Sequence, residues 1–216
     1  MKTFLEEMKE SFPKNIPMPP EIEAMFIWLE EKGFVHKYTS FDKRYANLYP
    51  EHLLDQGGAF SHFIPVERDT TKYYTGNDDP MVNDRLALFV NIDSTGDLAG
   101  LWQDEDGSLK YVYVGAHGEP GCILTDNAID FLRLLAIGYD NVALSNYNKT
   151  ATEDYLEYLE AGSQLPIEPI EFREWVEKTF AVKVPKYGKE IVKIHPSMVN
   201  ETTPDPFLQW CRKVCN

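Results

Sequence analysis

The chain has little cysteine and no long apolar run. Its three cysteines are Cys122, Cys211 and Cys215 in 216 residues. A small, odd set of this kind is typical of a reducing compartment and supplies no disulfide framework. The opening segment, MKTFLEEMKESFPK, lacks the apolar stretch of a secretory signal, and no later segment is long and apolar enough to cross a bilayer. The sequence therefore predicts a cytoplasmic protein without membrane contact.

Basic residues are also scarce. Lys and Arg number 21 against 35 Asp and Glu, which gives a formal net charge of -14. Nucleic acids and anionic membranes both need a basic surface, so this charge argues against either as a partner. The charge permits a basic protein partner that is drawn in by electrostatic steering. It is equally compatible with an acidic surface that only keeps the protein in solution.

Motifs for nucleotide binding or nucleophilic catalysis are absent. The sequence contains no P-loop, no Gly-rich dinucleotide fingerprint and no G-x-S-x-G elbow. The nearest signal is His117-x-Glu119 followed by Cys122, which shares its first half with the zinc deaminase pattern. A catalytic zinc needs three protein ligands, and here Cys122 stands alone. We predict no catalytic residue, no metal and no cofactor. A small hydrolase that uses His117 and Glu119 is the minor alternative.

Strand and turn signals follow one another closely after residue 96. Asp106-Gly107 is typical of a tight hairpin turn, because glycine adopts positive φ at little cost. The segments 98–102 and 109–114 flank this turn, and the second alternates with bulky residues on both faces. A further short strand is predicted over 121–124. The hairpin therefore predicts a central antiparallel pair that is covered on both sides.

The helix predicted after these strands is apolar on nearly all sides. Thr125 is its expected N-cap. Leu132 and Leu135 are expected to be buried against the sheet. One sheet cannot cover so wide an apolar arc. Ile129 and Leu134 are therefore expected to contact the helices predicted near the C-terminus.

The rest of the chain gives plainer signals. Residues 1–19 could form a short helical turn, but their prolines favour an arm that leads into the domain. The sequence also predicts helices over 21–32, after the capping box Thr150-x-x-Glu153, from Pro169 and from Pro204, with strands over 85–92 and 189–194.

Several of these features together carry a family resemblance. They are Gly96-Asp97 before a strand that ends in Leu101-Trp102, the acidic hairpin, Val114-Gly115, the loop His117-Gly118-Glu119, the run from Asp130 to Ala136, and upstream the segment from Pro50 to Gly58. On these residues the chain resembles the SUKH superfamily. That group includes the yeast cell-wall-assembly regulator and many bacterial immunity proteins. The clearest part of the resemblance covers residues 96–139.

The resemblance implies an α+β fold, with a mostly antiparallel sheet and helices packed against it. It implies one SUKH-like domain over 1–216, most recognisable over 85–140, in which 141–216 form extra C-terminal helices packed on the core. It also implies a binding role without catalysis. The partner would be a bacterial toxin domain, neutralised by an immunity protein. The alternative is a regulatory scaffold or adaptor without a toxin partner.

The candidate partner-binding residues come from two loops. Asp104, Glu105 and Asp106 lie at the predicted hairpin tip, and His117 and Glu119 lie in the loop after the second hairpin strand. Adjacent carboxylates on a wet tip do not offer the unlike environments that acid–base catalysis needs. They are suited either to docking a basic partner or simply to solvation.

Overall fold

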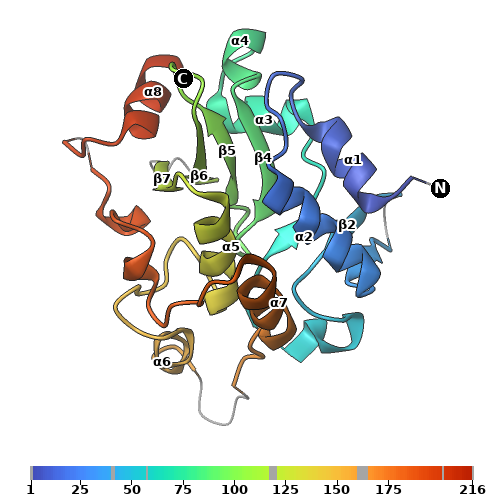
Figure 1. Ribbon diagram of the computed structural model, residues 1–216. Helices are drawn as coiled ribbons and strands as arrows, with labels where there is room; N and C mark the ends of the chain where they lie inside the picture. Colours follow the sequence, from blue (N-terminus) through green and yellow to red (C-terminus); the bar gives the residue numbers. More distant parts are fainter. Residues whose placement is uncertain are drawn as a thin grey trace.

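The structure, a computed structural model, describes residues 2–39, 42–56, 58–116, 121–159, 165–200 and 202–215. It contains an antiparallel sheet of seven strands whose spatial order follows the chain, with helices on both faces (Figure 1). The strands are β1 (Val35–Lys37), β2 (Arg44–Ala46), β3 (His62–Phe63), β4 (Leu86–Asn91), β5 (Leu98–Gln103), β6 (Leu109–Val114) and β7 (Cys122–Thr125). The predicted α+β class is confirmed.

The helices occur before, between and after the strands. They are α1 (Phe4–Ser11), α2 (Pro20–Glu31), α3 (Arg68–Thr75), α4 (Pro80–Asn83), α5 (Ala128–Ile137), α6 (Ala151–Leu156), α7 (Ile170–Phe180) and α8 (Pro206–Val214). Three 3-10 turns are η1 (Glu51–Gln56), η2 (Gly188–Glu190) and η3 (Pro196–Met198).

The central strands agree with the sequence pattern. β5 pairs with β6 from Leu98 opposite Val114 to Gln103 opposite Leu109. In β6, Tyr111 and Tyr113 pack into the larger core while Val112 packs into a separate cluster on the other face. The prediction of a central strand covered on both sides is therefore confirmed.

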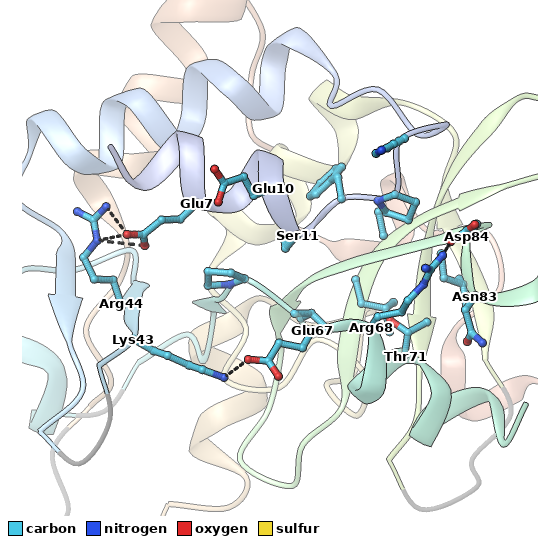
Figure 2. A pocket seen from close by; sticks show the side chains of 18 of the residues that line it. Glu7, Glu10, Ser11, Lys43, Arg44, Glu67, Arg68, Thr71, Asn83 and Asp84 are labelled. Atoms are coloured by element: carbon cyan, nitrogen blue, oxygen red, sulfur yellow. Dashed lines mark hydrogen bonds and ion pairs between the residues drawn. The ribbon is translucent and has the colours of Figure 1, made fainter. Parts of the chain in front are cut away.

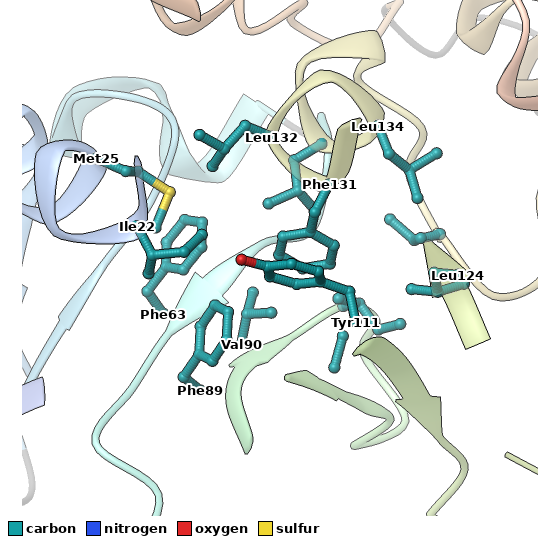
Figure 3. Close-up of a cluster of buried hydrophobic side chains, with 14 of the residues drawn as sticks. Ile22, Met25, Phe63, Phe89, Val90, Tyr111, Leu124, Phe131, Leu132 and Leu134 are labelled. Atoms are coloured by element: carbon teal, nitrogen blue, oxygen red, sulfur yellow. The ribbon is translucent and has the colours of Figure 1, made fainter. Parts of the chain in front are cut away.

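The larger core lies between the sheet and helices α2, α5 and α7. Phe131 of α5 stacks on Tyr111, with ring centroids 4.6 Å apart, and meets Phe89 of β4 edge-on (Figure 3). Leu132 and Leu135 are 0% and 1% exposed, which confirms their predicted burial. The core consequently rests on aromatic contacts between α5 and the middle of the sheet.

The start of α5 differs from the prediction. The N-cap is Asn127, whose Oδ1 accepts a hydrogen bond from Asp130 N at 3.1 Å. Thr125 instead ends β7, and its hydroxyl accepts from Asn127 N at 3.2 Å. Asn and Thr are both good N-cap residues. The pairing of β7 with β6 holds Thr125 in the strand, so Asn127 caps the helix. At the other end Gly138 adopts φ 90°, as its position after the helix predicts.

The C-terminal helices divide between the two faces of the sheet. Arg173 of α7 donates to the carbonyls of Ala136 and Ile137, both at 3.1 Å, so α7 does cover α5. α8 lies on the opposite face, where Phe207 and Trp210 pack on Trp102 with centroids 5.3 and 5.7 Å apart. The expectation that all these helices cover α5 is therefore wrong for α8. The reason is that the side chain of Trp102 points away from α5, so a different helix, α8, buries it.

Two further predictions are wrong. The first nineteen residues contain α1, which Thr3 and Glu6 begin as a reciprocal capping box and which buries Phe4 and Met8. The segment predicted as a strand over 189–194 begins in η2. There Gly188 N donates to the Tyr139 hydroxyl at 2.9 Å, a contact that local sequence does not signal.

Gly100 in β5 is expected to tolerate no larger residue. A Cβ at this position would lie 2.3 Å from Ala87 O and 2.5 Å from Leu88 Cα, where β4 carries a bulge. Both contacts are with backbone, so the strands would have to move apart. Gly100→Ala is expected to lower the free energy of unfolding by about 1–3 kcal/mol, measured by urea unfolding. An unchanged urea midpoint would contradict this close approach.

Candidate functional site

A groove of 1170 Å³ opens beside β4, the fourth strand of the sheet. Its walls come from α1 and the turn after it (Glu7–Asn15), from the β1–β2 hairpin, and from the segment 65–71 that leads into α3. Its fourth side is the N-terminal half of β4, Leu86–Leu88, together with the preceding turn. We call this feature the β4 groove. Figure 2 shows Lys43 and Arg44 at one end of it and Arg68 and Asp84 at the other.

Ion pairs join the separate segments that form the walls. Arg44 Nε donates to both carboxylate oxygens of Glu7 at 3.1 Å, and Lys43 Nζ lies 2.6 Å from Glu67 Oε1 (Figure 2). Arg68 pairs with Asp84 at the far end. Exposed pairs of this kind contribute only about 0–1 kcal/mol each. They serve mainly to hold α1, the hairpin and α3 at fixed separations.

The β4 groove is locally neutral in a strongly acidic protein. Its lining contains five acidic residues and five basic ones, whereas the whole chain has 35 acidic and 21 basic residues. The acidic residues are Glu7, Glu10, Asp42, Glu67 and Asp84, and the basic residues are Lys14, Lys37, Lys43, Arg44 and Arg68. The groove therefore does not share the repulsion that the rest of the surface exerts on anionic ligands.

The predicted acidic tip lies beside one end of this groove. Asp104 N donates to Ser108 O at 2.9 Å and closes the β5–β6 turn, and Glu105 and Asp106 are exposed. A hydrogen bond from Ser108 lowers the pKa of Asp106, so this carboxylate stays charged. The residue before the tip, Gln103, accepts a hydrogen bond from Asn15 of the groove wall at 3.0 Å. The tip and the groove thus form one continuous surface.

His117 and Glu119 lie outside the described residues. Ala116, just before them, follows the end of β6 that is opposite the acidic tip, and its N–H donates to Asp97 at 2.8 Å.

Most of the residues that line the β4 groove were not predicted from the sequence. Glu7 and Glu10 lie on a helix that was not predicted, and Arg68 begins another. The capping box Thr3-x-x-Glu6 is a sequence signal that could have placed the first of these helices. The pairing of Arg44 with Glu7 joins segments 37 residues apart, which no local pattern indicates.

Two buried carboxylates on the β4–β5 side have structural partners. Asp93 is 1% exposed and accepts hydrogen bonds from Gly96 N at 2.9 Å and Asp97 N at 2.8 Å. Asp97 is 4% exposed and accepts from the Tyr113 hydroxyl at 3.0 Å. Carboxylates held in this way stabilise the turn between the strands. Within the described ranges, no three His, Cys, Asp or Glu side chains are grouped as a metal would require. Each described helix is too short or too polar to traverse a lipid bilayer.

A row of rings crosses β1, β2 and β3 on the face away from α2. Tyr45 lies between His36 and His62, with centroid distances of 5.4 Å to each, and Phe60 stacks on His62 at 4.3 Å. Burial and the neighbouring His36 lower the pKa of His62. His62 therefore stays neutral in the folded protein at pH values where the unfolded chain protonates it.

This arrangement predicts a pH-dependent loss of stability. Below the ordinary histidine pKa of about 6.5, the unfolded chain binds a proton that the folded His62 does not. The free energy of unfolding should therefore fall as the pH drops from about 6.5 toward the folded pKa. His62→Gln is expected to make the urea-unfolding profile less steep in this window, because it removes the group whose pKa differs between the folded and unfolded states. A profile as steep in His62→Gln as in the parent protein would assign the effect to other groups.

Comparison with known proteins identified no relative of this chain. No protein-family model, no curated protein and no solved structure matches this chain. The class of protein that fold and site define is an α+β protein with an antiparallel meander sheet and a groove beside its fourth strand.

Proposed function

We propose that this protein is a non-enzymatic protein-binding module, and that it acts as an immunity protein that neutralises a bacterial toxin domain by direct binding. The observation that carries the proposal is the surface formed by the β4 groove and the acidic tip. A cavity of 1170 Å³ bounded by four chain segments is larger than most small-molecule pockets, which measure about 300–1,000 Å³. It is a size suited to a segment of another protein.

The charge distribution supports a basic partner. A net charge of -14 attracts a basic domain over long range and raises the association rate. The exposed carboxylates of Glu105 and Asp106 would then meet that domain next to the groove. The SUKH resemblance over residues 96–139 is compatible with this role, because it implies a binding protein without catalysis.

The proposal predicts how the acidic tip affects binding. The variant with Asp104→Asn, Glu105→Gln and Asp106→Asn together removes three charges without changing side-chain size. With a toxin domain encoded by a neighbouring gene, it should bind about tenfold more slowly at low salt and show a weaker salt dependence. Stopped-flow or surface plasmon resonance measures both. A matched control is Asp69→Asn with Asp78→Asn and Asp79→Asn, which removes three exposed charges around α3 and its turn into α4.

Two outcomes would overturn parts of the proposal. If the parent protein and the toxin domain form no complex at low salt, the immunity role is wrong, and a regulatory adaptor remains. If the complex forms but both charge variants bind equally fast, the partner docks away from the acidic tip.

A further inference from the structure

The segment 178–193 has the opposite charge to the rest of the chain. It carries one carboxylate, at Glu190, and five lysines, in a protein whose formal net charge is -14. The lysines, all of which are exposed, are Lys178, Lys183, Lys186, Lys189 and Lys193. We call this segment the lysine strap. Salt screens charge beyond about 8 Å at physiological ionic strength, so a ligand that touches the strap meets a positive surface even though the distant field is negative.

The backbone of the lysine strap is held against the core. Arg133 Nε of α5 donates to Lys183 O at 2.7 Å, and Lys189 N donates to Tyr147 O at 3.3 Å. Apolar residues of the strap point inward, and Ile191 and Val192 are 6% and 3% exposed. Figure 1 shows the strap leaving the end of α7 and passing α5 on its way to α8. Its lysines are therefore displayed outward from a fixed backbone, which limits the backbone entropy that a ligand must overcome.

Most of these lysines have no carboxylate partner. Glu177 Oε2 lies 2.9 Å from Lys183 Nζ and its Oε1 accepts from Val184 N at 3.0 Å, so both of its oxygens are engaged. Lys189 Nζ lies over the neutral ring of Tyr187, 5.3 Å from its centroid. Within the described ranges, no ion pair is made by Lys178, Lys186, Lys189 or Lys193. The chain has 35 carboxylate residues and 21 basic ones, so a shortage of carboxylates does not explain this.

The charge pattern favours a short acidic ligand over a nucleic acid. Duplex DNA carries one negative charge about every 1.7 Å along its axis, and it would continue past the strap over an acidic surface that repels it. A short acidic segment of a protein can end where the strap ends. Lysine ammonium groups are compact, mobile donors that accept carboxylates in many orientations, as an irregular peptide requires.

We propose that the lysine strap is a second docking surface of this protein and binds a short acidic segment of another protein. This inference goes beyond the proposed function, because the acidic tip suits a basic domain whereas the strap suits the opposite charge. Carboxylates of the bound segment would pair with the lysines that lack partners. The interaction should therefore be salt-dependent and specific for charge more than for sequence.

The first test uses the full chain and a defined probe, an acetylated and amidated heptapeptide of alternating glutamate and serine. Followed by NMR at about 20 mM salt, the peptide should cause saturable shift changes in the amides of 178–193, and its affinity should fall about fivefold at about 150 mM salt. The same peptide with glutamine in place of glutamate should not bind. Equal binding of both peptides, no saturable shifts, or shifts spread evenly over the surface would each overturn the proposal.

Charge variants locate the binding surface. Lys186→Gln with Lys189→Gln and Lys193→Gln should weaken peptide binding at least about fivefold. The matched control is Lys2→Gln with Lys9→Gln and Lys32→Gln, which removes the same charge from exposed lysines that already pair with carboxylates. Thermal melts check that both variants are folded. If both weaken binding equally, the net charge determines binding and the strap is not a docking surface.

A heptamer of deoxythymidine tests the class of partner. It should bind the lysine strap more weakly than the glutamate peptide at about 150 mM salt, because the acidic surface around the strap repels its backbone. Tighter binding of the oligonucleotide, with shifts in the amides of 178–193, would make a nucleic acid the partner and the proposal wrong. None of these measurements uses a toxin domain, so a failure of the proposed immunity role leaves their outcome unchanged.

Discussion

A chain that ends at Asn148 is expected to lose cooperative unfolding and to aggregate. It would lack α7, whose Phe172 and Val176 are both 0% exposed in the core, and α8, which covers Trp102. The carbonyls of Ala136 and Ile137 would lose the hydrogen bonds from Arg173. Apolar surface would therefore be exposed on both faces of the sheet at once, and patches of this kind promote association.

The measurement is a thermal melt followed by circular dichroism, with gel filtration before heating. A chain that ends at Thr203, which lacks only α8, is the matched comparison. It should still melt cooperatively at a reduced temperature, because α7 continues to cover α5. If the chain ending at Asn148 melts cooperatively at the parent temperature, the region after it is an independent module, and the prediction of one domain over 1–216 is wrong.

Phe131→Ala is expected to lower the free energy of unfolding by about 3–5 kcal/mol. Phe131 is 0% exposed and contacts two aromatic side chains of the sheet, Tyr111 face-on and Phe89 edge-on (Figure 3). Removing it leaves a cavity that α5, held by α7, cannot easily close. Urea unfolding measures the loss. Phe131→Leu, which keeps most of the volume, should cost clearly less.

A substitution at Tyr111, on which Phe131 stacks, tests whether ring stacking is the source of this stability. The Tyr111 hydroxyl is buried and has no hydrogen-bond partner among the described residues. Tyr111→Phe keeps the ring and removes a buried polar group, so it should leave stability unchanged or raise it by about 1 kcal/mol. A large loss in Tyr111→Phe would show that the hydroxyl is hydrogen-bonded in solution and that ring stacking alone does not stabilise α5.

The acidic tip and the β4 groove are separate parts of the proposed binding surface. The acidic tip acts through charge and should govern the association rate and its salt dependence. The tip was predicted from three adjacent carboxylates, whereas the β4 groove was not predicted.

Local sequence determined the central part of the fold. The alternation over 109–114 and the Asp106-Gly107 turn predicted β5 and β6, and the apolar arc around Leu132 predicted a helix buried on more than one side. These signals are short-range, because side-chain period and turn chemistry depend on residues a few positions apart. The α+β class was expected from the family resemblance that the same residues carry.

Only the tertiary structure decided the rest. It placed α8 on the face opposite α5, made Asn127 the cap of α5 where Thr125 was expected, and joined Arg44 to Glu7 across the groove. Each of these features depends on contacts between segments distant in the chain. A local pattern specifies which side chains must be covered, but which segment covers them is settled by packing.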